Sequence, residues 1–164
     1  MSNKLNNLQS FGTVGDKEIE RTNALTLYRD SREYFEYYQR GKPNKSVDLS
    51  KVSYFLLMRS LELGLKAILK TKEGISTLSL RVTFGHDVAK IYFYCLDKKY
   101  IEPFDKEFET ALKMAGGYYK EKDFEYTKIG YKELPSTSYL VDMIEKVYTT
   151  INTVFTDTKI QKFL

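Results

Sequence analysis

The stretch LSKVSYFLLMRSLELGLKAILKTKEG, Leu49 to Gly74, carries the strongest helical signal in the chain. Its large apolar residues recur at steps of three and four, which places them on one face of a helix. The stripe consists of Tyr54, Met58, Leu61, Leu65 and Ile68, and Phe55, Leu57 and Leu69 widen it. Gly64 lies inside this helix at a cost of roughly 1 kcal/mol relative to alanine, so we expect a neighbouring helix to approach closely there.

Four more segments have a helical period. They are 23–40, ended by Gly41 and Pro43; 86–100; 102–117, with Pro103 at its first position and Gly116–Gly117 at its end; and a last helix that starts at Ser136 to Ser138. Tyr118 to Pro135 is predicted to be an extended loop or weak hairpin that could carry function. The expected fold is therefore all-α, an up-and-down bundle of about five helices.

The chain has 164 residues, enough for one domain with a proper core. Residues 1–22 are polar and are predicted to be a loosely ordered arm, with Lys17 to Arg21 as its one candidate helical stretch. Residues 23–164 are predicted to form the single helical domain. No stretch approaches the roughly 20 apolar residues that span a bilayer, and the first ten residues lack the apolar core of a secretion signal. We therefore expect a cytoplasmic protein without a membrane partner.

The composition narrows the possible chemistry. Cys95 and His86 are the only cysteine and histidine, so an intrachain disulfide is excluded and no cysteine-based metal site or cofactor is expected. The chain also lacks a glycine-rich phosphate loop and a nucleophile elbow. The net charge of +4 is spread along the chain, which permits contact with phosphates without arguing strongly for it. The 14 tyrosines could stack on bases, but packing is the simpler interpretation.

Two short patterns stand out. Glu62 and Lys66 have the favourable i,i+4 order of an ion pair on a solvated helix face. Gly85, His86 and Asp87 precede a helical period, where glycine can turn the chain and a His or Asp side chain can accept bonds from the first amides of the helix. An acidic residue there also complements the helix dipole. If the two patterns interlock, we expect His86 to meet Glu62 in a buried hydrogen bond.

In this order, the two patterns resemble the HEPN family (higher eukaryotes and prokaryotes nucleotide-binding domains). The resemblance covers roughly residues 23–155 and rests on Glu62-x-x-x-Lys66, followed by Gly85, His86, Asp87 and an aliphatic Val88. It implies a helical bundle that forms a homodimer and binds nucleotide, RNA or a companion nucleotidyltransferase. Glu62, Lys66, Gly85 and Asp87 would then be binding or structural residues.

The nuclease members of that family carry an arginine, four to six residues and a histidine, brought together from two subunits as a metal-independent RNA-cleaving site. Arg81 lies five residues before His86 and matches that spacing. In this interpretation His86 transfers a proton at the ribose 2′-hydroxyl or the leaving oxygen, and Arg81 holds the phosphate. Val82 departs from the polar residue that usually follows the arginine, and Arg81 is expected to lie in a linker.

The leading hypothesis from the sequence is a non-catalytic, dimerising HEPN-like module that binds nucleotide, RNA or a companion nucleotidyltransferase. The alternative is an endoribonuclease that acts through Arg81 and His86, as a toxin or antiphage effector. A helical adaptor without a nucleic-acid role is the second alternative.

Overall fold

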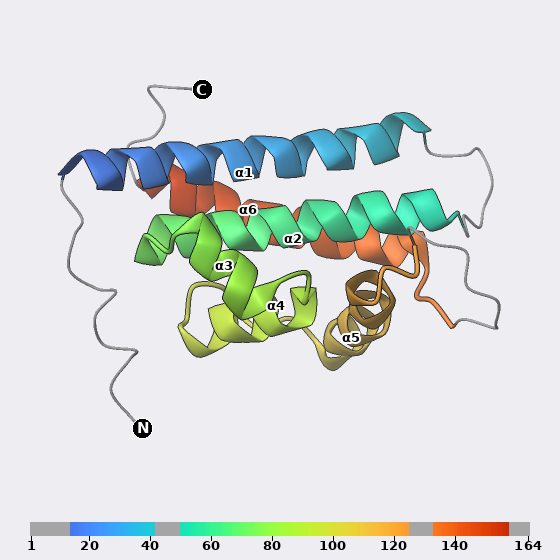
Figure 1. The fold of residues 1–164 in the computed structure, drawn as a ribbon. Helices are drawn as coiled ribbons and strands as arrows, with labels where there is room; N and C mark the ends of the chain where they lie inside the picture. Colours follow the sequence, from blue (N-terminus) through green and yellow to red (C-terminus); the bar gives the residue numbers. More distant parts are fainter. Residues whose placement is uncertain (1–13, 42–49, 125–132, 158–164) are drawn as a thin grey trace.

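The computed structural model describes residues 14–41, 50–124 and 133–157, and these contain helices and no strand. The helices are α1 (Val14–Gly41), α2 (Lys51–Glu73), α3 (Thr77–Phe84), α4 (Val88–Asp97), α5 (Lys106–Lys120) and α6 (Thr137–Asp157). The predicted all-α bundle is therefore confirmed. Figure 1 shows α2 at the centre, with α1 above it, α6 running behind it, and α3, α4 and α5 below it.

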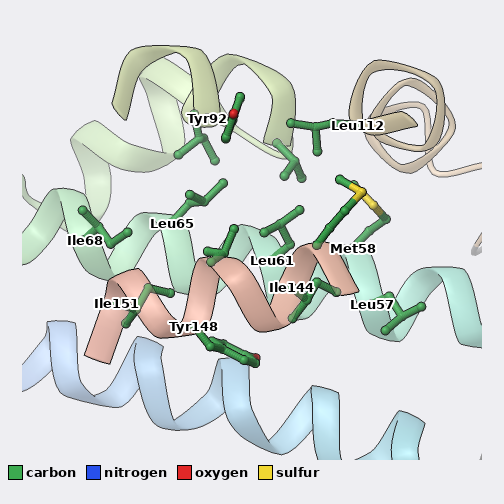
Figure 2. Close-up of a cluster of buried hydrophobic side chains, with 14 of the residues drawn as sticks. Leu57, Met58, Leu61, Leu65, Ile68, Tyr92, Leu112, Ile144, Tyr148 and Ile151 are labelled. Atoms are coloured by element: carbon green, nitrogen blue, oxygen red, sulfur yellow. The ribbon is translucent and has the colours of Figure 1, made fainter. Parts of the chain in front are cut away.

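The predicted apolar stripe of α2 is the middle of the core. All five of its residues are 0–1% exposed, and side chains of α4, α5 and α6 pack around them (Figure 2). The last helix, α6, also buries an apolar stripe, from Leu140 to Val154. A helix with partners on both sides needs apolar residues over most of its circumference, which is why extra leucines widen the stripe of α2.

The expected close approach at Gly64 is confirmed. A Cβ atom there would lie 2.8 Å from Cδ1 of Ile151 in α6 and 3.1 Å from Oγ of Ser31 in α1. Next to it, the buried Ser31 hydroxyl donates to the carbonyl of Ser60 at 2.6 Å, and the Tyr148 hydroxyl donates to the carbonyl of Ser31 at 2.8 Å. Gly64 thus lets three helices meet closely enough to share a buried hydrogen-bond network.

The described residues form six helices where the sequence predicted about five, because α3 forms where a linker was expected. Ser76 caps it by accepting a hydrogen bond from the Ser79 amide at 3.1 Å. Its only buried residues are Leu80 and Phe84, one turn apart. An eight-residue helix with one buried pair is too short to show a helical period, so no sequence pattern indicates α3.

The predicted ends of two other helices are also wrong. The first helix begins at Val14 instead of Asn23. The fifth begins at Lys106, with Asp105 as its N-cap, and continues through Gly116–Gly117 to Lys120. Neither glycine has a positive φ, and Tyr119 beyond them is 3% exposed. Burial of that ring outweighs the roughly 1 kcal/mol that each glycine costs.

The predicted loop or weak hairpin at Tyr118 to Pro135 is only partly testable. Its first residues are helical, 121–124 form a turn, 133–135 belong to no helix, strand or turn, and 125–132 lie outside the described residues. Residues 1–13 of the predicted N-terminal arm lie outside them too. Within the described part of the chain, no helix is both long and apolar enough to cross a bilayer.

Candidate functional site

The site is centred on Glu62 in α2, whose side chain is 0% exposed. Lys66 Nζ lies 2.5 Å from Glu62 Oε1, and an Arg59 guanidinium nitrogen lies 3.0 Å from Oε2. The predicted Glu62–Lys66 pair is therefore present, because residues four apart share a helix face. The expectation that it lies on a solvated face is wrong, since α5 and the α3–α4 turn cover the carboxylate.

The α3–α4 turn docks directly onto this ion pair. Lys66 Nζ donates to the carbonyl oxygen of Gly85 at 2.6 Å, and His86 Nδ1 lies 3.3 Å from Glu62 Oε2. Gly85 has φ 54° and ψ −120°, and a positive φ of this kind favours glycine. The two sequence patterns therefore interlock as predicted, but the His86 side chain is 48% exposed and not buried.

Asp87 acts as the N-cap of α4, as predicted for the start of a helix. Its Oδ1 accepts a hydrogen bond from the Lys90 amide at 3.0 Å, and its Oδ2 lies 2.9 Å from Lys120 Nζ. Burial raises the pKa of Asp87, but the hydrogen bonds from Lys120 and from the Lys90 amide outweigh it and lower that pKa below its ordinary value. Asp87 thus holds the turn against α5 without contacting Glu62.

Sequence reasoning missed two members of the site, Arg59 and Tyr119. Tyr119 reaches Glu62 from α5 and donates its hydroxyl to Oε2 at 2.5 Å. The sequence predicts Tyr119 in the loop after the paired glycines, so no sequence pattern indicates its contact with Glu62. Arg59 lies three residues before Glu62, and this i,i+3 spacing could have identified it.

The electrostatics keep Glu62 ionised. Burial raises its pKa, but the Lys66 ammonium and the hydrogen bonds from Lys66 and Tyr119 outweigh burial and lower the pKa below 4.5. Burial, and then the charge of Glu62, raise the pKa of Tyr119, so its phenol remains a donor. Burial lowers the pKa of Arg59, but the charge of Glu62 together with the interactions with Tyr119 outweighs burial and leaves that pKa raised.

The carboxylate balances only one of the two cations that it binds. Arg59 and Lys66 carry two positive charges against the single negative charge of Glu62, even when His86 is neutral. Arg59 and His86 form the outer side of the cluster, with side chains 29% and 48% exposed, whereas Lys66 is 11% exposed. Because His86 turns Nδ1 toward Glu62, its Nε2 points away from the carboxylate. The arrangement can attract and hold an anion at the surface.

Arg81 does not join this cluster. It lies on α3 and not in a linker, and its side chain is exposed. Among the interactions of the described residues, none connects the side chains of Arg81 and His86; the Arg81 carbonyl only accepts a hydrogen bond from the Gly85 amide at 3.0 Å. Within one chain, the two residues proposed for cleavage are therefore not brought together.

Among the described residues, no three His, Cys, Asp or Glu side chains are grouped in a way that could hold a metal ion. Comparison of the chain with protein-family models, curated proteins and solved structures finds no match.

Proposed function

We propose that the protein is a non-catalytic HEPN-like module, dimeric as that resemblance implies, that binds a phosphate group of a nucleotide or RNA at Arg59 and His86. The surplus positive charge around the buried Glu62 supports this proposal most directly. The carboxylate fixes Arg59 and His86 within 3.0 and 3.3 Å of the same oxygen, so neither side chain needs to be ordered when a ligand binds. Charge-assisted hydrogen bonds to a phosphate oxygen are among the stronger polar interactions.

Replacement of Arg59 by glutamine should weaken binding of 5′-AMP or a short RNA about tenfold or more, because one charge-assisted bond contributes about 1.5–3 kcal/mol. Isothermal titration at several salt concentrations measures this, and the affinity of the wild type should fall as salt rises. Arg81→Gln is the matched control, because Arg81 is an exposed arginine outside the cluster. Absence of any salt-dependent association of either ligand would contradict the proposal.

One observation favours the alternative of an endoribonuclease. His86 is half-exposed, and its second ring nitrogen points away from Glu62, where it could reach a substrate. The arginine that would hold the phosphate in this mechanism is missing from the site, because Arg81 does not contact His86. We therefore expect neither the wild type nor His86→Ala to cleave single-stranded RNA in the presence of EDTA, as followed by gel electrophoresis. Cleavage by the wild type alone would instead establish His86 as a catalytic residue.

A further inference from the structure

A row of aromatic rings starts at the proposed phosphate site and crosses the molecule. His86 of the α3–α4 turn lies against Tyr119 of α5, which lies against Phe55 of α2, which lies against Tyr34 of α1. The successive ring centroids are 6.0, 6.1 and 6.4 Å apart. Four segments that are distant in the sequence thus contribute one continuous row.

The rings of this row are partly available to a ligand. Tyr119 is buried, Tyr34 and Phe55 are half-buried, and His86 is exposed. The interplanar angles along the row are 88°, 47° and 80°, so none of these contacts is a parallel stack that would cover a face of both rings. The row therefore has one buried ring, Tyr119, between the exposed His86 and the half-buried Phe55 and Tyr34.

Positive charge runs beside the rings. The Arg59 guanidinium lies 5.9 Å from the centroid of the Tyr34 ring while it also contacts Glu62. Lys120 follows Tyr119 in α5, and its side chain is 53% exposed next to Asp87. Arg59 is therefore the cation that lies against a ring of the row, whereas the charge of Lys120 is paired with Asp87.

From this juxtaposition we propose that the ligand of the site is single-stranded RNA, with its phosphates at Arg59 and His86 and its bases against Tyr34 and Phe55. The inference rests on the proposed phosphate site. Proteins that bind single strands combine a cationic track with aromatic rings on which unpaired bases stack. In a duplex the bases are stacked on one another and cannot reach such rings. A free nucleotide has a single base and can contact only one of the two rings.

The test is competition for a fluorescently labelled ten-nucleotide single-stranded RNA, followed by anisotropy. Unlabelled single strand should compete at least about tenfold better than a duplex of the same sequence or 5′-AMP. Phe55→Leu should weaken binding of the single strand at least about fivefold, because that is the smallest loss of affinity expected when one base loses its stacking on an aromatic ring. Tyr37→Leu is the control, because Tyr37 is 61% exposed on α1 and lies outside the row.

Tyr34→Leu serves as a second variant if Phe55→Leu fails to fold, which circular dichroism would show. Wild-type affinity in a folded ring variant overturns the inference, as does equal competition by duplex or 5′-AMP. In both of those cases, if Arg59→Gln still weakens binding, the proposed phosphate site remains supported. If no RNA or nucleotide binds at all, the proposed function and this inference fail together.

Discussion

Replacement of Glu62 by glutamine is expected to lower the free energy of unfolding by about 3 kcal/mol. The substitution keeps the shape of the side chain but removes the charge that Arg59 and Lys66 share. Removing one partner of a buried ion pair typically costs about 3–5 kcal/mol, because the other charge stays in a poorly solvated position. We expect the lower end of this range, because Lys66 retains its hydrogen bond to the carbonyl oxygen of Gly85 and Arg59 is partly exposed to water.

Thermal and chemical unfolding of the variant measure this loss, which corresponds to a fall in Tm of about 6–12 °C for a chain of this size. The matched control is Glu36→Gln. Glu36 pairs with Arg40 at 3.3 Å, also at i,i+4, but the two side chains are 46% and 75% exposed. That variant should stay within about 0.5 kcal/mol of the wild type. Equal effects of the two substitutions would show that Glu62 does not organise the site.

The pH dependence of this effect has a definite sign. The pKa of Glu62 is lowered in the folded protein, so below pH 4.5 the unfolded chain binds a proton before the folded one does. The stabilisation by Glu62 is thus fully present above that pH and is lost as the pH falls through the folded pKa. The difference in stability between wild type and Glu62→Gln should therefore narrow on acidification below pH 4.5, as followed by urea unfolding.

Replacement of Gly64 by leucine is expected to destabilise the fold by about 3 kcal/mol, the upper part of the usual range for an overpacked core. Even a Cβ atom at this position would lie 2.8 Å from Ile151 Cδ1 and 3.1 Å from Ser31 Oγ, and both residues are fully buried. A leucine therefore forces α1 or α6 away from α2 and disturbs the hydrogen bonds between Ser31 and Tyr148. Urea unfolding measures the change.

Gly117→Leu separates this packing effect from helix propensity. Gly117 is an exposed glycine inside α5, and a Cβ atom there would meet nothing within 4 Å. Both substitutions replace a helical glycine by a good helix former, worth up to about 1 kcal/mol. Gly117→Leu should therefore leave the protein as stable or slightly more stable. If Gly64→Leu behaves in the same way, the close approach of the three helices at Gly64 is not tight in solution.

Several local features of the site could be predicted from the sequence. The i,i+4 spacing of Glu62 and Lys66 depends only on helix geometry, and it places the two charges together in any helix. The N-cap role of Asp87 depends on the residues that follow it in the chain. The contact between His86 and Glu62 was predicted from the interlock of the two patterns, although the exposure of His86 was not.

Other features could not be predicted, because contacts from distant segments create them. Tyr119 enters the site only because α5 continues past two glycines, and packing of its ring against the core sustains that extra turn. Arg81 has the nuclease spacing from His86, but a capped α3 carries its side chain to an exposed position away from the cluster. Sequence separation alone does not set the distance between side chains on either side of a turn.

The sequence by itself determined the all-α class, the central helix with its apolar stripe and the close approach at Gly64. These features follow from helical periodicity and from the absence of a side chain, and both are local properties. Only the tertiary structure decided that Glu62 is buried, that Tyr119 reaches its carboxylate, and that four rings align beside it. Burial and alignment depend on which helices cover a residue, and the packing of the whole bundle sets that arrangement.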